Sequence, residues 1–173
     1  MLRYSSGNMS CRLDDEVVAV SARRAWLGEI TAQGVAVCRL ADGRSVNDVE
    51  LTAESGFHLG ILRSRRDINV VLHFQSPFAT AIACGREIDY NFNVIPELPI
   101  YVGEPAVVKY SPPGSKELAD ETIAAMQGHD LAILQNHGQV VVGKDFNDTI
   151  QKAGFFELAC QTLLLQNKPR FIQ

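Results

Sequence analysis

The feature of this sequence that most constrains its fold is a succession of short apolar segments with the two-residue period of a β-strand. Three such segments open the chain, at residues 8–13, 16–21 and 35–40, and the turn-forming pairs Asp14-Asp15 and Asp42-Gly43 follow the first and the third of them. Strands that are joined by tight turns pair as antiparallel neighbours. The first part of the chain therefore predicts an antiparallel meander.

Helical patterns join the strands further along the chain. Helices are expected at residues 55–66, 77–84, 115–127 and 147–166, and further strands at 68–75, 107–110, 131–135 and 139–142. Ser76 and Ser115 stand where a helix N-cap is expected, and the proline-rich residues 91–105 predict a loop. This order predicts an α/β fold, namely a three-layer α/β/α arrangement with a mixed, mostly antiparallel central sheet.

Size and composition narrow the class of protein. The 173 residues, of which 46% are hydrophobic and 21% charged, fit a single globular domain over residues 1–173. No apolar run approaches the ~20 residues that a bilayer span needs, and the N-terminus lacks the pattern of a signal peptide. The four cysteines form no C-x-x-C pair and are expected to be reduced. A net charge of −4 argues against nucleic-acid binding. We therefore expect a cytoplasmic protein with a small-molecule substrate and neither a nucleic acid nor a membrane as partner.

Three residues are candidates for chemistry. His73 ends an apolar strand, His137 stands in a tight turn before Gly138, and Glu54 opens a helix. Each also has a structural alternative: a core histidine satisfied by one hydrogen bond, a turn residue, and a carboxylate that caps a helix N-terminus. Two imidazoles and a carboxylate are also the parts of a metal-assisted acid–base site. The pattern therefore predicts that the three side chains meet in the fold.

Four motifs then point to a family. They are Gly7-Asn8-x-Ser10, Thr52-x-Glu54-x-x-Phe57-His58, Val71-Leu72-His73-Phe74-Gln75-Ser76-Pro77-x-Ala79-Thr80-Ala81 and Leu134-Gln135-Asn136-His137-Gly138. In this order, from residue 7 to about residue 165, the sequence resembles the class II aldolase/adducin family. That family includes L-fuculose-phosphate and L-rhamnulose-phosphate aldolases and L-ribulose-5-phosphate 4-epimerase.

The resemblance implies roles for particular residues. It makes His73 and His137 ligands of a divalent cation, usually zinc, and it makes Glu54 the acid–base residue that shuttles the proton. The cation would stabilise the enediolate that forms when a carbon–carbon bond breaks, so that stabilisation grows towards the transition state. The resemblance also implies a homotetramer. Contacts with a substrate phosphate fall, by the same resemblance, on Gly7, Asn8, Thr52 and Ala53.

The sequence departs from the family pattern at two places. Gln75 stands where relatives have the second histidine of a His-x-His pair, and an amide oxygen is a much weaker zinc ligand than an imidazole. The site would then bind metal weakly, use Glu54 as a third ligand, or bind no metal. Arg23 and Arg24 fall near the family's Thr-Gly loop, where they would grip a phosphate or carboxylate or be surface charges. The sequence also begins almost at Gly7, so the helices that precede this motif in relatives are expected to be missing from it.

These observations favour one function and leave two alternatives open. The favoured function is a divalent-metal-dependent aldehyde-lyase, or a related epimerase, that acts on a small sugar phosphate or hydroxy-carbonyl compound. The first alternative is a non-catalytic, adducin-like domain that serves assembly, which Gln75 would suit. The second is a metal-dependent hydrolase with no aldolase kinship. Retention of Glu54 with both histidines favours the enzyme, since a structural domain has no evident need for all three.

Overall fold

The structure is a computed structural model, and it describes residues 5–172. Within these residues, seven strands form one sheet in the order β3-β2-β1-β4-β7-β6-β5. The pair β5 and β6 is parallel, and every other neighbouring pair is antiparallel. The predicted mixed, mostly antiparallel sheet is therefore confirmed. The strands are β1 (Asn8–Arg12), β2 (Val17–Ser21), β3 (Val35–Arg39), β4 (Val70–Phe74), β5 (Ala106–Val108), β6 (Leu131–Leu134) and β7 (Gly138–Gly143).

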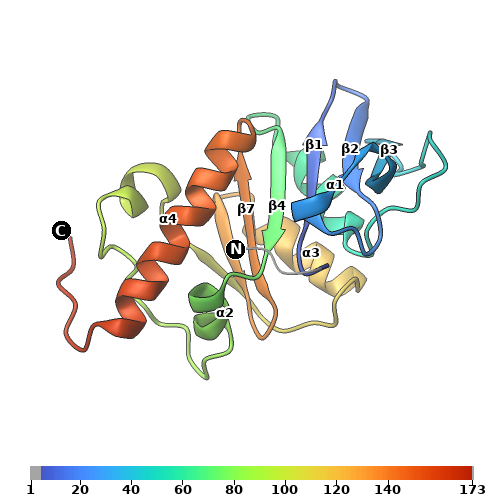
Figure 1. The fold of residues 1–173 in the computed structure, drawn as a ribbon. Coiled ribbons are helices and arrows are strands. Elements are labelled where there is room, and N and C mark those ends of the chain that lie inside the picture. Colours follow the sequence, from blue (N-terminus) through green and yellow to red (C-terminus); the bar gives the residue numbers. More distant parts are fainter. Residues whose placement is uncertain (1–4, 173) are drawn as a thin grey trace.

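Helices cover both faces of the sheet and complete the three layers. On one face, α1 (Ser55–Ser64) and α3 (Lys116–Ala125) share a cluster of buried apolar side chains with the strands. On the other face, α2 (Pro77–Ala83) and α4 (Phe146–Leu165) enclose a second cluster, and Figure 1 shows α4 running obliquely beside β7. None of the helices in the described part combines the length and the apolar character that crossing a membrane requires. Short helical turns lie at η1 (Leu27–Glu29), η2 (Ala32–Gly34) and η3 (Leu98–Val102).

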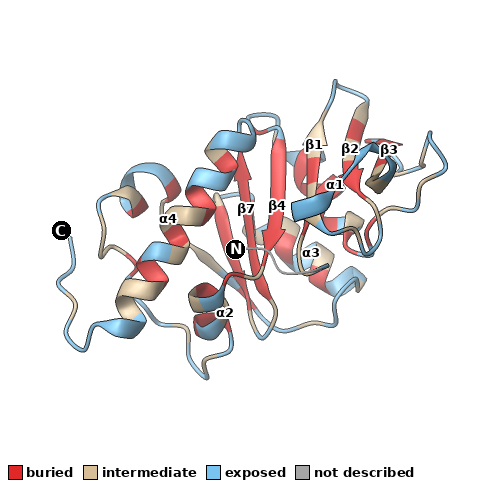
Figure 2. Ribbon diagram, viewed as in Figure 1, coloured by how far each residue is buried: buried red, intermediate tan, exposed pale blue. Residues whose placement is uncertain are grey.

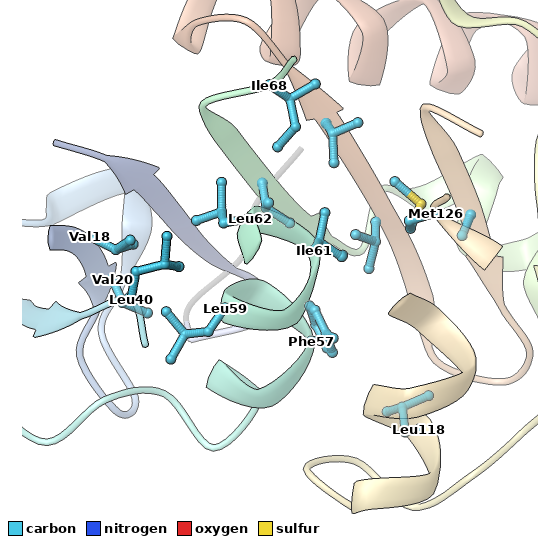
Figure 3. Close-up of a cluster of buried hydrophobic side chains, with 14 of the residues drawn as sticks. Val18, Val20, Leu40, Phe57, Leu59, Ile61, Leu62, Ile68, Leu118 and Met126 are labelled. Carbon is cyan, nitrogen blue, oxygen red and sulfur yellow. The ribbon is translucent and has the colours of Figure 1, made fainter. Parts of the chain in front are cut away.

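The central strands β4 and β7 are buried along their whole length (Figure 2). Because both of their faces are covered, apolar residues occupy nearly every position, as expected for a strand buried on two sides. Figure 3 shows how Phe57, Ile61 and Leu62 of α1 project into the first of the two apolar clusters. His73 is the single polar residue of β4, and it is 1% exposed. A polar side chain in this position needs partners, and those partners define the site described below.

One of the two expected helix caps is present and the other is replaced. Ser115 caps α3 by accepting a backbone N–H of the first turn at 3.1 Å. Ser76 does occupy the N-cap position of α2, as predicted, but its hydroxyl makes no capping hydrogen bond and instead donates to Glu157 Oε2 of α4 at 2.6 Å. Glu157 itself accepts the backbone N–H groups of Phe78 and Ala79 at 3.0 and 2.9 Å. A carboxylate is a stronger acceptor than a hydroxyl at the positive end of a helix dipole, so α4 caps α2.

The segment expected to be a loop is partly helical. Within residues 91–105, Leu98–Val102 form a single π-helical turn, η3. Leu98 and Val102 are buried in the apolar cluster beneath α4. The prolines of this segment concealed the turn because they interrupt any periodic pattern, and packing against α4 stabilises it instead.

Candidate metal centre

Three polar side chains from separate elements converge beside the carboxyl end of β4. His73 comes from β4, Glu54 directly precedes α1, and His137 lies in the turn between β6 and β7. One ligand atom of each side chain lies within 4.8 Å of those of the other two, and the two imidazole centroids are 4.7 Å apart. The structure thus brings together the three residues that the sequence pattern singled out.

The close approach of the two histidines depends on the backbone of the β6–β7 turn. Asn136 adopts a left-handed conformation with φ of 54°, which reverses the chain directly before His137. A Cβ atom on Gly138 would lie 2.6 Å from the carbonyl oxygen of Phe74 and 3.2 Å from His73 Cε1. Only glycine fits at this position, so Gly138 allows the turn to pack against the end of β4 and allows the imidazoles to meet.

The hydrogen bonding of His73 prepares one ring nitrogen for a ligand. Its Nδ1 lies 2.9 Å from the backbone carbonyl oxygen of Gln139. A carbonyl can only accept, so Nδ1 carries a proton, and in the neutral form of the ring Nε2 keeps its lone pair. That Nε2 faces Glu54 Oε2 at 3.6 Å. A neutral imidazole held through its other nitrogen by a backbone carbonyl is the usual state of a metal-binding histidine.

His137 and Glu54 contain buried atoms that lack partners. His137 Nε2 lies 3.4 Å from Glu54 Oε1. Burial, and then the charge of His73, lower the pKa of His137, while Glu54 opposes this shift. The imidazole is therefore biased towards the neutral form that binds metals. Neither Glu54 Oε1 nor His137 Nδ1 has a hydrogen-bond partner, although buried polar atoms are normally paired. Two imidazole nitrogens and a carboxylate oxygen suit a divalent cation such as Zn²⁺, Mn²⁺ or Fe²⁺, so the residues present fit such an ion.

Glu54 is held from the other side by β1. Its side chain makes no capping bond to α1, so the capping alternative is wrong. Instead, Glu54 Oε2 accepts a hydrogen bond from Asn8 Nδ2 at 2.8 Å. Both residues are 8% exposed. The carboxylate is thus fixed at one oxygen and unpaired at the other.

Sequence reasoning did not assign a role to His58, which completes this arrangement. The imidazole is fully buried, with Nε2 2.5 Å from Asn8 Oδ1 and Nδ1 2.9 Å from Ser10 Oγ. Burial, and then the charge of His73, lower the pKa of His58 to about 3. The spacing was a usable signal, because His58 follows Glu54 by four residues, and residues four apart lie on the same side of a helix.

The residues expected to contact a phosphate lie close by in the chain. Gly7 precedes β1 with φ of 105°, a conformation that favours glycine. The Asn8 side chain already contacts Glu54 and His58 through its two polar atoms. Of the two residues that precede Glu54, Thr52 is buried and Ala53 is exposed.

Gln75 and the pair Arg23 and Arg24, where the sequence departs from the family pattern, lie in different surroundings. Gln75 is half-buried, and its Cγ would lie 2.9 Å from a Cβ on Gly138, so Gln75 is a neighbour of the β6–β7 turn. Arg23 is exposed and forms an ion pair with Glu50 at 2.7 Å. Arg24 is exposed with φ of 61°. The two arginines lie beside the segment that leads to Thr52 and Glu54, and they do not belong to the cluster of Glu54, His73 and His137.

An apolar cavity of about 540 Å³ lies elsewhere in the structure. Met9, Leu72 and Phe74 contribute to its wall, and they alternate along β1 and β4 with Asn8 and His73. Successive side chains of a strand point to opposite faces of the sheet. This cavity and the Glu54–His73–His137 cluster are therefore on different faces, and the cavity contains no acid–base pair.

Comparisons with known proteins show the family to which the chain belongs. The sequence profile described as "Class II Aldolase and Adducin N-terminal domain" matches residues 1–164. The chain is 31% identical to a 3-oxo-tetronate 4-phosphate decarboxylase of Haemophilus influenzae, over 83% of this chain and 69% of that protein. It is 33% identical to an L-fuculose phosphate aldolase of Methanocaldococcus jannaschii, over 93% and 85% of the two chains. The chain therefore belongs to the class II aldolase and adducin family.

A solved structure supports the fold. The crystal structure of YgbL from Klebsiella pneumoniae matches with a TM-score of 0.92, covering 99% of this chain and 85% of that one. The identity is 24%, so this likeness shows the fold alone. The strand order and the similar solved structure both confirm the predicted α/β class.

Proposed function

We propose that this protein is a zinc-dependent lyase that breaks a carbon–carbon bond in a small phosphorylated sugar or hydroxy-carbonyl acid. The observation that carries the proposal is the buried cluster of Glu54, His73 and His137, whose ligand atoms lie within 4.8 Å of one another. The relatives named above are an L-fuculose phosphate aldolase and a 3-oxo-tetronate 4-phosphate decarboxylase. Both reactions break a carbon–carbon bond and leave an electron pair next to a carbonyl group, so one kind of site would serve either.

The residues of the cluster would have separate roles in the reaction. His73 and His137 would hold the cation, with Gln75 as a weak further ligand or none. When bound, the cation would supply Lewis-acid chemistry by attracting the negative charge that develops on substrate oxygens. Glu54 would hold and return the proton through Oε1, which has no hydrogen-bond partner. The burial of these side chains keeps water away and strengthens the electrostatic interactions among them.

The remaining assignments are proposals from the family pattern. Substrate phosphate would contact the positions at the start of β1 and before α1, and the two exposed arginines would lie at the edge of that site. Asn8 has fewer groups free to contact a phosphate than the other positions, because both polar atoms of its side chain are already hydrogen-bonded to Glu54 and His58. We also propose one domain over residues 1–173, a cytoplasmic location and a homotetramer. The proposed phosphate positions are Gly7, Asn8, Thr52 and Ala53, with Arg23 and Arg24 at the edge.

The Glu54→Gln variant tests the function. It is nearly isosteric, so the melting temperature should stay within a few degrees of wild type, since ~1 kcal/mol shifts a domain of this size by ~2–4 °C. Turnover of ketose 1-phosphates or phosphorylated 3-oxo acids, with added Zn²⁺, Mn²⁺ or Co²⁺, should fall ~10²-fold or more. Glu121→Gln, on the exposed side of α3, is the matched control and should keep full activity. A Glu54→Gln variant as active as wild type would overturn the role of Glu54, and an inert wild type would favour the adducin-like alternative.

A further inference from the structure

A continuous row of buried hydrogen bonds leads from β1 to the carboxylate of Glu54. Ser10 Oγ lies 2.9 Å from His58 Nδ1, His58 Nε2 lies 2.5 Å from Asn8 Oδ1, and Asn8 Nδ2 lies 2.8 Å from Glu54 Oε2. Asn8 and Ser10 are two residues apart in β1 and therefore share a face of the sheet. Glu54 and His58 are four residues apart at the start of α1 and share a side of the helix.

The chemistry of the groups dictates the direction of every bond in this row. An ionised carboxylate only accepts, so Asn8 must present its Nδ2–H to Glu54. The Asn8 oxygen then faces His58 and can only accept, so Nε2 of His58 carries the proton. A neutral imidazole has one N–H, so Nδ1 is bare and accepts from the hydroxyl of Ser10. The reverse orientation of the amide would place its oxygen against the carboxylate.

Burial supports the neutral state on which this direction depends. His58 is 0% exposed, and its pKa is lowered to about 3, first by burial and then by the charge of His73. Near neutral pH the imidazole therefore has a single proton. Each donor in a row of hydrogen bonds polarises the next one, so the row acts on its last acceptor as a unit.

We propose that Ser10, His58 and Asn8 are positioning residues that tie Oε2 of Glu54 in place and thereby assign the proton transfer to Oε1. Oε1 is buried without a hydrogen-bond partner and lies 3.4 Å from His137 Nε2, whereas Oε2 is the oxygen that faces His73 Nε2 at 3.6 Å. A carboxylate that is held at one oxygen cannot exchange its two oxygens by rotation. The part of this proposal that concerns turnover rests on the proposed function, whereas the hydrogen-bond row exists in the protein without metal or substrate.

Histidine tautomers in metal-free protein test the row without any activity. Long-range ¹H–¹⁵N correlation spectra of protein labelled at histidine distinguish Nε2–H from Nδ1–H. We expect His58 to be the Nε2–H tautomer in wild type, and we expect Asn8→Ala to remove this preference by removing the acceptor. A wild-type His58 that carries its proton on Nδ1, or on both nitrogens near neutral pH, overturns the proposal.

Kinetics then test what the row does for Glu54. His58→Leu removes both hydrogen bonds and should lower kcat by about tenfold or more while KM changes little, because the loss concerns orientation and not substrate binding. His58→Gln retains a donor and an acceptor and should restore part of kcat. An unchanged kcat in a folded His58→Leu variant overturns the positioning role.

A milder variant covers the case in which His58→Leu does not fold. Ser10→Ala removes one hydroxyl at the far end of the row, and it should lower kcat by a few-fold with KM unchanged. Ser64→Ala, at the exposed end of the same helix α1, is the matched control. A kcat for Ser10→Ala equal to that of Ser64→Ala overturns the proposal. A wild type that turns over no substrate overturns the proposed function and, with it, the role in turnover, while the tautomer of His58 decides separately whether the row exists.

Discussion

Acid should destabilise this protein through His58. The ordinary pKa of 6.5 applies to the unfolded chain, and the folded value is about 3. Because the folded pKa is depressed, the unfolded chain binds a proton that the folded protein does not, and stability falls as the pH falls from about 6.5 towards about 3. The limiting slope is about 1.4 kcal/mol per pH unit, so lowering the pH from 7.5 to 5 should cost about 2 kcal/mol from this residue alone. A domain of this size should then melt about 4–8 °C lower.

Urea unfolding of metal-free wild type and His58→Gln, at several pH values between 7.5 and 5, measures this contribution. Other titrating groups are common to both proteins and cancel in the difference. The difference in the free energy of unfolding should change by about 2 kcal/mol across this range, to the disadvantage of wild type at the acid end. A difference that stays constant with pH would refute the reasoning. The C2 proton of His58 in folded wild type should also keep its NMR shift down to pH 5, which requires no variant.

Three further substitutions test the packing and the metal site. Gln75→His should raise zinc affinity at least ~10-fold, or about 1.4 kcal/mol, in a calorimetric titration, and an unchanged affinity would remove residue 75 from the site. Gly138→Ala should weaken zinc binding and cost roughly 1–3 kcal/mol, because its Cβ would meet a backbone oxygen at 2.6 Å and His73 at 3.2 Å; wild-type affinity would contradict the geometry. Gly60→Ala should lower the free energy of unfolding in urea by about 1–3 kcal/mol, because its Cβ would lie 2.1 Å from Ile123 Cδ1. Ile123→Ala should suppress most of that loss, and a double mutant whose effects are fully additive would argue against this contact.

Patterns within single elements made much of the fold predictable. The meander strands, the buried strand that carries His73 and the long final helix were expected within a few residues of their observed bounds. These signals are local, because the period of apolar residues and the turn residues between them are written into consecutive positions. The three candidate ligands were also predictable, since each stands at the end of an element where a side chain can leave the apolar pattern.

Partners distant in the sequence were not predictable in this way. Ser76 has the residue type and the position of a helix cap, yet the cap is Glu157, which lies 81 residues from Ser76. No local pattern marks such a pair, because only the packing of α4 on α2 brings the carboxylate to the helix N-terminus. The π-helical turn at Leu98–Val102 has the same origin, since contacts with α4 stabilise it and its own sequence does not favour it.

The candidate site was likewise predictable from the sequence only in part. The sequence by itself determined which residue types are available, namely two imidazoles and a carboxylate at the ends of apolar elements. The tertiary structure alone decided that Asn8 reaches Glu54 across 46 residues and that Ser10 reaches His58 across 48. The physical reason is that a hydrogen bond depends on position and direction to within a few tenths of an ångström, and these are set only when β1 and α1 pack together.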